Sequence, residues 1–328
     1  PYVELQAGLA RTQAEYAAMP PGAQWCWLEA YGPCEADPKA ARHTDFGAAS
    51  RRLEAQLDER LGYAWMESEL DHLVTEYGVD GFKFDAGDMQ FYDPSGIISF
   101  KQDSIPNDHT QYFAKLGLKY PLNEYRASWK MAGLPLAQRL RDKTPEWADL
   151  RQLIPGIIAQ GLMGYAYTCP DMIGGGEYQS FLALDSIDQE LVVRSAQVHA
   201  LMPMMQFSVA PWRVLSPENN AICKDMANLH AEFGEEILEM ARQSSRTGEP
   251  IVKPMTWFWP DAGYETIDDQ FILGEEVLVA PVVVSGARSR EVVFPEGTWI
   301  GDDGSEVEGP VSVRSDVPRE RLPYYRLQ

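Results

Sequence analysis

The alternation of apolar and polar positions along the chain predicts an α/β organisation from residue 63 onward. Apolar side chains recur at helical spacing between Trp65 and Tyr77, and Gly78 ends this helix. The short apolar run at residues 79–84 then predicts a buried strand, which leads into an acidic loop at residues 85–88. A helix, a glycine, a strand and a loop in this order form one unit of a parallel sheet.

A second unit of the same kind is predicted further along. Residues 147–162 have helical spacing, residues 164–168 read as a strand, and Pro170-Asp171 begins the loop after it. Pro155 disfavours regular helix in the first half of that helical segment. The remaining patterns predict long helices at 186–202 and 221–245, strands at 251–259, 270–273 and 277–284, and a hairpin at 291–300 that turns at Pro295-Glu296-Gly297.

Residues 1–62 have a different pattern. The stretch at 20–38 is rich in Pro, Gly and Trp and predicts loop, whereas leucines four residues apart predict a helix at 48–61. The chain is therefore expected to have three parts. These are an N-terminal segment (1–62), an α/β region (63–260) and a C-terminal β-rich region (261–328).

Composition narrows the class of partner. The chain has 328 residues, which fits about two domains. It carries 28 Lys and Arg against 49 Asp and Glu, a formal net charge of −21, which argues against nucleic acid and anionic membranes as partners. The longest apolar run, at 277–284, contains Pro281 and is far shorter than the roughly 20 residues of a spanning helix. With no signal-peptide pattern at its start, the chain is expected to be soluble.

Several kinds of site are disfavoured by what the sequence lacks. There is no G-x-G-x-x-G, Walker or G-x-S-x-G motif, which argues against dinucleotide oxidoreductases, P-loop enzymes and α/β-hydrolases. The four cysteines contain no C-x-x-C pair, and no two of the five histidines lie three or four residues apart. We therefore expect no metal and no cofactor, and the candidates for chemistry are carboxylates and aromatic residues.

Asp85 is the strongest candidate. It follows a predicted strand, and side chains at the carboxyl ends of the strands converge on the active site of a β/α barrel. Lys83 lies two residues earlier, on the same face of the strand, where its ammonium would keep Asp85 ionised. An ionised carboxylate suits a nucleophile. The structural alternative is that Asp85 caps the next element.

Asp142 and Asp171 are the other carboxylate candidates. Asp142 lies among Arg139, Arg141 and Lys143, which is also the pattern of a solvated salt-bridge cluster. Asp171 follows the second predicted strand and precedes a glycine run at 174–176. That run lacks the Lys-Ser/Thr of a phosphate loop and so favours a sugar-facing loop. Among the tryptophans, Trp129, Trp147 and Trp212 can each stack on a sugar or pack in a core.

The succession of motifs from about residue 65 to residue 328 resembles glycoside hydrolase family 31. The segment Gly78-Val79-Asp80-Gly81-Phe82-Lys83-Phe84-Asp85-Ala86-Gly87-Asp88 is similar to the nucleophile motif of that family. Further similar motifs follow in the family's order: Gly161-Leu162-Met163-Gly164, Asp171 with Gly174-Gly175, residues 200–207, Pro211-Trp212, residues 268–275, Val279-Ala280-Pro281-Val282 and residues 294–299.

This resemblance implies a retaining α-glycosidase, a (β/α)8 TIM barrel followed by a β-sandwich, with no cofactor. Matching the motifs places the nucleophile at Asp85 and the acid/base at Asp142, and it places substrate-binding roles at Lys83, Asp88, Arg139, Trp147 and Asp171. Charge on Asp85 would raise the pKa of Asp142, whereas Arg139 and Arg141 would oppose that rise. The expected partner is an α-linked oligosaccharide or glycoside.

Two segments resemble the bacterial branch that contains α-galactosidases. They are Arg141-Asp142-Lys143, where most members have Gly-Asp-Asn, and Lys83-Phe84-Asp85-Ala86-Gly87-Asp88. Pro170 stands where a His commonly precedes Asp171, which argues against the usual glucose-type contacts. We therefore expect α-galactosides as substrates. Either the bacterial cytoplasm or the periplasm is compatible with such a protein.

Residues 1–62 do not resemble that family. They are similar to a β-sandwich module of large, sugar-related bacterial proteins. The family's nucleophile strand is the fourth of eight, so we expect a barrel incomplete on its N-terminal side and a chain that is a poor enzyme alone. The alternative function is a non-catalytic carbohydrate-binding or scaffold fragment.

Overall fold

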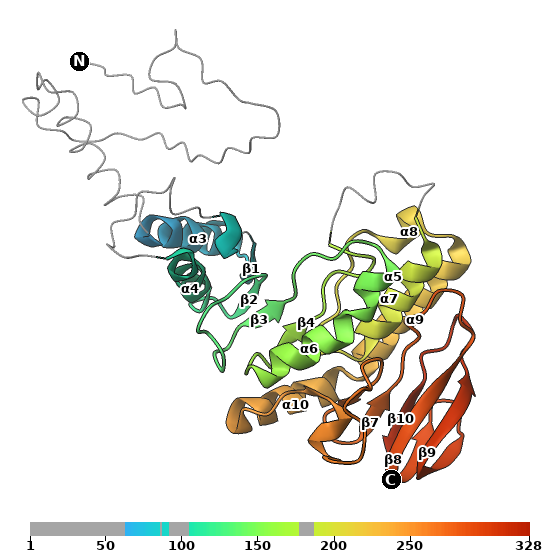
Figure 1. Ribbon diagram of the computed structural model, residues 1–328. Coiled ribbons are helices and arrows are strands. Elements are labelled where there is room, and N and C mark those ends of the chain that lie inside the picture. Colours follow the sequence, from blue (N-terminus) through green and yellow to red (C-terminus); the bar gives the residue numbers. More distant parts are fainter. Residues whose placement is uncertain (1–62, 86, 92–104, 177–186) are drawn as a thin grey trace, which may run out of the picture. The chain divides into compact units, whose positions relative to one another are not determined.

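The computed structural model describes residues 63–85, 87–91, 105–176 and 187–328 (Figure 1). The N-terminal segment at 1–62, with its predicted helix at 48–61, lies outside the described residues. The chain divides into two compact units, Pro1–Tyr77 and Gly78–Gln328. In the first unit, α3 (Tyr63–Tyr77) confirms the helix predicted there. The second unit contains every predicted site residue.

A parallel sheet of four strands opens the second unit. It consists of β1 (Gly81–Phe84), β2 (Leu122–Tyr125), β3 (Ala137–Arg139) and β4 (Thr168–Cys169), in that order across the sheet. All three neighbouring pairs are parallel. The sequence predicted β1, and its second predicted strand, at 164–168, overlaps β4 at Thr168. It predicted neither β2 nor β3.

Helices connect these strands, as in a β/α barrel. Helix α4 (Pro106–Gly117) lies between β1 and β2, whereas α5 (Trp147–Arg151) and α6 (Leu153–Leu162) lie between β3 and β4. The predicted single helix at 147–162 is thus two helices that meet at Gln152. Pro155 lies in the first turn of α6, where a backbone N–H has no acceptor within the helix, so it is accommodated there without loss of a hydrogen bond.

The described residues form a partial α/β region and no complete barrel. Strand β1 is at one edge of the sheet, and an open groove of about 780 Å³ runs along the strands, lined by residues that include Phe82, Leu122 and Ala137. Leu122 has an exposed fraction of 62%, unusual for an apolar residue of a barrel strand. This open face agrees with the predicted incomplete barrel.

An antiparallel sheet of six strands forms the C-terminal part, in the order β5-β6-β7-β10-β8-β9. The strands are β5 (Val252–Lys253), β6 (Phe271–Leu273), β7 (Val277–Val279), β8 (Ser289–Gly301), β9 (Glu306–Asp316) and β10 (Tyr324–Leu327). Buried Phe294, Trp299 and Tyr325 dominate the hydrophobic cluster of this sheet. The predicted β-rich C-terminal region is therefore present.

The hairpin predicted at 291–300 is wrong. Strand β8 continues through Pro295-Glu296-Gly297 and pairs with β9, and the turn lies further on, around Gly304 at φ +76°. The pairing shifts register between Phe294 and Gly297, as in a β-bulge. A glycine within a strand can mark a bulge as well as a turn, and here Gly297 has φ +124° inside the strand.

A layer of helices lies between the two sheets in Figure 1. It comprises α7 (Gln189–Ala200), α9 (Pro217–Glu232) and α10 (Gly234–Thr247). The short α8 (Pro211–Val214) precedes α9, and a short 3-10 turn (Met255–Trp257) follows β5. One hydrophobic core contains residues of α6, α7, α9 and the C-terminal strands, and so joins the α/β region to the antiparallel sheet. Within the described ranges, no helix is long and apolar enough to cross a membrane.

Candidate active site

The carboxyl ends of the four parallel strands bring a cluster of charged side chains together. This is the edge at which parallel strands of a barrel present their functional groups. Each strand contributes at least one charged residue at or just beyond its end: Asp85 and Asp88 after β1, Glu124 and Arg126 at β2, Arg139 and Asp142 at β3, and Asp171 after β4.

Arg126 holds three of these carboxylates. Its Nη1 lies 3.0 Å from Oδ1 of Asp85 and 2.8 Å from Oδ2 of Asp142, so these two oxygens are at most about 5.8 Å apart. Its Nε and Nη2 donate to Oδ2 of Asp88 at 2.9 and 2.7 Å. The carboxyl groups of retaining glycosidases are separated by roughly 5–5.5 Å, and the upper limit set by Arg126 is compatible with that spacing.

Arg139 is the second centre of the cluster, and its side chain is only 1% exposed. Its Nη1 donates to Oδ1 of Asp142 at 2.5 Å and to Oδ1 of Asp171 at 3.1 Å. Its Nε donates to Glu124 at 3.1 Å, and its Nη2 lies 3.5 Å from Oδ1 of Asp85. A guanidinium with this many carboxylate neighbours fixes their relative positions.

The predicted partner of Asp85 has a different set of neighbours. The Lys83 ammonium donates to Oε1 of Gln206 at 3.1 Å and lies 3.5 Å from Oε1 of Glu124. The guanidiniums of Arg126 and Arg139 lie beside Asp85, whose side chain is half exposed. The cations beside Asp85 are therefore two arginines from neighbouring strands, whereas the predicted Lys83 lies beside Glu124.

The pKa of Asp142 lies below its ordinary value. Burial by itself would raise this pKa, but the hydrogen bonds and charges of Arg139 and Arg126 outweigh that effect. The guanidinium of Arg141, which the sequence placed beside Asp142, donates to the backbone oxygen of Asp142 at 3.1 Å, and its ion pair is with Asp149, at 3.7 Å. Without a ligand, Asp142 is thus a carboxylate at neutral pH.

Asp171 is buried and its carboxylate is fully engaged. Its side chain is 1% exposed, Oδ1 accepts from Arg139, and Oδ2 accepts from the backbone N–H of Lys143 at 2.7 Å and of Gly176 at 3.0 Å. Burial raises its pKa, whereas the backbone hydrogen bonds and Arg139 oppose the rise. In this arrangement a sugar would have no access to its carboxylate.

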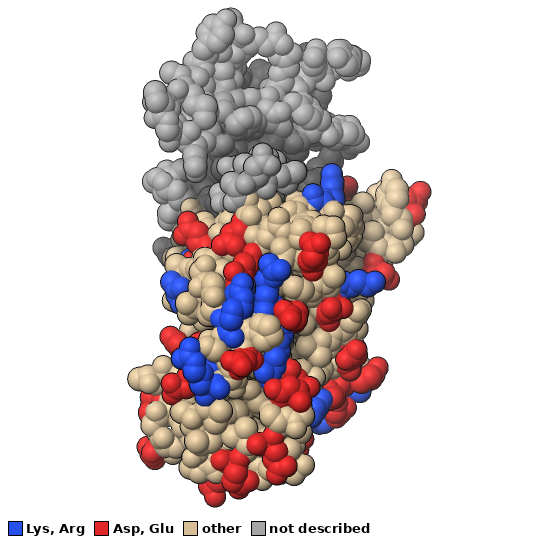
Figure 2. Space-filling model, turned by 90° about the vertical axis from the view of Figure 1, so that its right-hand side faces the viewer, with Lys and Arg blue, Asp and Glu red and all other residues tan. Residues whose placement is uncertain are grey.

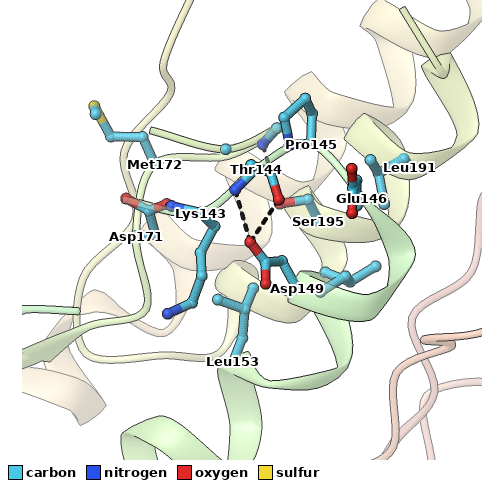
Figure 3. A pocket seen from close by; sticks show the side chains of 13 residues that line it. Lys143, Thr144, Pro145, Glu146, Asp149, Leu153, Asp171, Met172, Leu191 and Ser195 are labelled. Carbon is cyan, nitrogen blue, oxygen red and sulfur yellow. Dashed lines mark hydrogen bonds between the residues drawn. The ribbon is translucent and has the colours of Figure 1, made fainter. Parts of the chain in front are cut away.

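The loop between β3 and α5 is held by a second carboxylate. Oδ2 of Asp149 accepts from the backbone N–H of Thr144 at 2.7 Å and from its hydroxyl at 2.8 Å (Figure 3). A small cavity of about 20 Å³ lies between this loop and α7. The backbone amides of two successive residues, Lys143 and Thr144, are therefore each bound by an aspartate from elsewhere in the fold.

Trp147 is the predicted site residue that the described contacts do not bring to the charged cluster. Its indole N–H donates to Oδ2 of Asp188 at 2.8 Å, and its ring packs against the main hydrophobic core. Arg126, Glu124 and Gln206 are part of the cluster, but the sequence analysis missed all three. Arg126 could have been suspected only from its position, because it is a charged residue directly after the short segment that forms β2.

The charged cluster consists of carboxylates and of the guanidinium groups that bind them. Within the described part of the chain, no group of three His, Cys, Asp or Glu side chains could hold a metal ion. Four carboxylates of the cluster, those of Asp85, Asp88, Asp142 and Asp171, share the guanidinium groups of Arg126 and Arg139. The arrangement therefore brings two carboxylates, those of Asp85 and Asp142, close together beside two guanidinium groups.

His199 supports this cluster from α7. It is completely buried, and its Nε2 and Nδ1 lie 2.9 and 2.7 Å from the backbone oxygens of Asp171 and Ser195. Burial lowers its pKa from 6.5 to about 4. On acidification the unfolded chain therefore binds a proton before the folded chain does, so stability present above pH 6.5 is lost as the pH falls toward 4.

We expect this effect to lower the free energy of unfolding by about 3 kcal/mol across that window, since each pKa unit corresponds to about 1.4 kcal/mol. Urea unfolding at a series of pH values measures it, with His199→Gln and His230→Gln compared. The His199 variant should lose this part of the pH dependence, and the variant at the partly exposed His230 should keep it. Equal slopes for wild type and His199→Gln would show that the prediction is wrong.

Comparison with known proteins finds one matching domain family and several relatives. Residues 248–326 match the glycosyl hydrolase family 31 C-terminal domain. The myogenesis-regulating glycosidase of Mus musculus is 33% identical over 264 residues, 77% of this chain and 37% of the relative. Alpha-glucosidase 2 of Bacillus thermoamyloliquefaciens is 23% identical, over 79% of this chain and 36% of the relative. The chain thus spans little more than a third of the length of these relatives.

Solved structures show the same fold. The cycloalternan-degrading enzyme from Trueperella pyogenes, in complex with a covalent intermediate, matches 81% of this chain and 39% of its own, with a TM-score of 0.69 and 22% identity. A dextranase of Flavobacterium johnsoniae, complexed with isomaltotriose, matches 81% of this chain and 36% of its own, with the same score and identity. The chain therefore has a family 31 C-terminal domain and glycosidase homologues. Neither these relatives nor these structures are named for α-galactosides.

Proposed function

We propose that this chain carries the catalytic carboxylates of a retaining α-glycoside hydrolase. Asp85 is the proposed nucleophile and Asp142 the proposed acid/base. The observation that carries the proposal is the contact of both carboxylates with one nitrogen of Arg126, which keeps the two oxygens within about 5.8 Å. Inverting enzymes need roughly 6.5–9.5 Å between their carboxyl groups, because a water molecule must fit between one of them and the sugar.

The proposed reaction has two displacements. Asp85 attacks the anomeric carbon and forms a glycosyl ester, while protonated Asp142 gives its proton to the departing glycosidic oxygen. In the second step Asp142 removes a proton from water, and the water oxygen displaces Asp85 from the anomeric carbon. Esterification removes the negative charge of Asp85, which lowers the pKa of Asp142 and suits its change from acid to base.

Asp142 must carry a proton for the first step. In the structure its two oxygens accept from Arg139 and Arg126, which favour the charged form. A substrate whose glycosidic oxygen takes the place of one guanidinium at Asp142 would weaken this effect. Productive binding therefore includes a rearrangement of Asp142 relative to Arg126 or Arg139.

The proposed substrate is an α-linked carbohydrate. Lys83 and Asp88 are the best supported of the predicted substrate-binding residues, because each is partly exposed and adjoins the Asp85–Asp142 pair through Glu124 or Arg126. Arg139 is buried and contacts both carboxylates of the pair, so its proposed role is to hold them. Trp147 has the least support, because its indole N–H is bonded to Asp188. We further propose that residues 63–260 are part of the catalytic barrel and that 261–328 belong to the β-sandwich.

A mechanism-based label tests the proposal. An α-configured cyclophellitol-type epoxide should attach covalently to Asp85, as found by peptide mass mapping of the labelled chain. The label requires a nucleophile and a nearby acid, so it reports on both proposed roles. Attachment to another residue, or no attachment to a folded sample, would contradict the proposal and favour the alternative of a non-catalytic carbohydrate-binding or scaffold fragment.

The finer proposal concerns the sugar. Arg141-Asp142-Lys143 and Pro170 support an α-galactoside, whereas several named relatives are α-glucosidases. We expect the galacto-configured epoxide to label the chain faster than the gluco-configured epoxide under identical conditions, with both rates followed by intact mass. Faster labelling by the gluco compound would overturn the α-galactoside proposal and leave the assignment of Asp85 intact.

A further inference from the structure

We infer that Asp171 is a positioning residue that holds Asp142 and Arg139 in place, and that it does not bind the sugar itself. The inference rests on the proposed function, because Asp142 is the acid/base only within that proposal. It gives Asp171 a role different from the substrate contact that the family resemblance implies.

The burial of Asp171 is the first argument. Its side chain is 1% exposed, whereas those of Asp85 and Asp142 are 50% and 37% exposed. Both of its carboxylate oxygens accept hydrogen bonds from the protein, from Arg139, from Lys143 N–H and from Gly176 N–H. A carboxylate with both oxygens engaged and almost no exposed surface can act on other residues but not on a ligand.

The bonds of Asp171 lead directly to the acid/base. Lys143 follows Asp142 in the chain, so fixing the Lys143 amide fixes the backbone beside Asp142. Nη1 of Arg139 donates to Asp171 and to Asp142 alike, and the two carboxylates therefore share one guanidinium nitrogen. Asp171 thus limits the movement of both the loop and the cation that contact the acid/base.

The glycine run after Asp171 fits closely against the same loop. A Cβ at Gly176 would lie 2.8 Å from Oδ1 of Asp142 and 2.9 Å from Oδ1 of Asp171. A Cβ at Gly175, where φ is +104°, would lie 2.8 Å from the Lys143 carbonyl oxygen. These distances are shorter than a carbon–oxygen contact allows, so the glycines permit an approach that any side chain would prevent. The absence of side chains at Gly175 and Gly176 therefore allows Asp171 and the loop that carries Asp142 to lie in contact.

The backbone of Asp171 is held as well as its side chain. Its backbone oxygen lies 2.9 Å from Nε2 of His199, on α7, and accepts from Sγ of Cys169, at the end of β4, at 3.3 Å. The groups that face it from the neighbouring elements are thus Arg139, Lys143, Cys169 and His199, with Asp142 opposite. The contacts with β4 and α7 fix the backbone of Asp171. Its carboxylate can therefore hold the Lys143 amide, and with it the loop, in one position.

Asp171→Asn tests the inference, with Asp149→Asn as a matched control. Both variants replace a carboxylate that binds one backbone amide of the same loop, but the Asp149 oxygens bind Thr144 and Arg141 and not Arg139. A second variant, Gly176→Ala, leaves every charge in place and pushes the two carboxylates apart sterically.

The first measurement is amide hydrogen exchange followed by NMR. In Asp171→Asn the Lys143 and Gly176 amides should exchange about tenfold faster, because an amide oxygen is a weaker acceptor than a carboxylate. In Asp149→Asn the Thr144 amide should respond and the Gly176 amide should not. Unchanged exchange of Lys143 and Gly176 in Asp171→Asn would overturn the inference whether or not the chain is a glycosidase.

The second measurement is the kinetics of covalent labelling at Asp85. Asp171→Asn and Gly176→Ala should each lower the maximal labelling rate by about a hundredfold, with little change in the label concentration that gives half that rate. A rise in that half-saturating concentration with an unchanged maximal rate would show that Asp171 contacts the sugar. If the wild-type chain is not labelled at all, the proposed function fails, and hydrogen exchange still decides whether Asp171 holds the loop.

Discussion

Replacing Asp85 by asparagine is expected to abolish covalent labelling, with a fall in rate of at least about 10⁴-fold. Asparagine has the size of aspartate and its side-chain oxygen can still accept from Arg126, so the fold around the cluster should be retained. The amide oxygen is nevertheless a very poor nucleophile toward the anomeric carbon. Removal of a covalent nucleophile typically costs a factor of this order. Intact-protein mass spectrometry after incubation with the epoxide measures the outcome.

Asp88→Asn is the matched control for this experiment. Asp88 follows the same strand and binds the same guanidinium, through Nε and Nη2 of Arg126. Its role in the proposed reaction is to bind substrate, so this variant should still be labelled, at a reduced rate. Equal loss of labelling in both variants would mean that the charge of the cluster, and not a nucleophile at Asp85, governs the reaction.

The strands that the sequence predicted are those with a clear apolar signal. Residues 79–84 are a short apolar run that contains β1, and the predicted strand at 164–168 ends at Thr168, the first residue of β4. Strands β2 and β3 have the sequences LNEY and AQR, in which polar residues interrupt any period of two. Such strands depend on pairing with their neighbours, which a pattern along one chain cannot show. Missing β2 meant missing Arg126, which directly follows it.

The sequence predicted which types of residue form the candidate site, but it did not predict which of them form ion pairs with one another. The sequence correctly grouped Arg139 and Asp142, which are three residues apart and bonded. It also placed Arg141 beside Asp142 and Lys83 beside Asp85, since neighbours in sequence were the available guide. The structure keeps Arg141 at the backbone oxygen of Asp142, but it pairs the Arg141 charge with Asp149. It brings Arg126 to both proposed catalytic carboxylates from another strand. Ion-pair partners are set by the arrangement of strand ends, which local sequence does not encode.

Arg194 illustrates the same limit outside the site. It lies within a segment correctly predicted as helix, where an arginine is ordinarily expected to face solvent. In α7 its side chain is fully buried between the α/β region and the C-terminal sheet. Its Nη2 donates to the backbone oxygens of Ala287 and Val317 at 3.1 and 3.2 Å, and its Nη1 donates to Gln197 at 2.8 Å.

These bonds tie α7 to the chain segments that flank the β8–β9 hairpin. Nη1 of Arg194 also lies within 3.5 Å of the backbone oxygens of Pro318 and Arg321, and Gln197 donates to the Arg319 oxygen at 2.8 Å. Burial lowers the pKa of Arg194 to about 10, which leaves it charged at neutral pH. The partial charges of several carbonyl oxygens therefore take the place of water around this guanidinium.

Arg194→Ala is accordingly expected to lower the free energy of unfolding by about 3–5 kcal/mol, the usual cost of removing one partner from a buried charged network. The substitution leaves the carbonyl oxygens of Ala287 and Val317 buried without their donor and opens a cavity between α7 and the C-terminal sheet. Urea unfolding followed by circular dichroism measures the loss. Arg242→Ala, which removes a 55% exposed arginine paired with Glu239 on α10, should change stability by less than about 1 kcal/mol. A similar small change for Arg194→Ala would show that the helix and the sheet are held together by their apolar core alone.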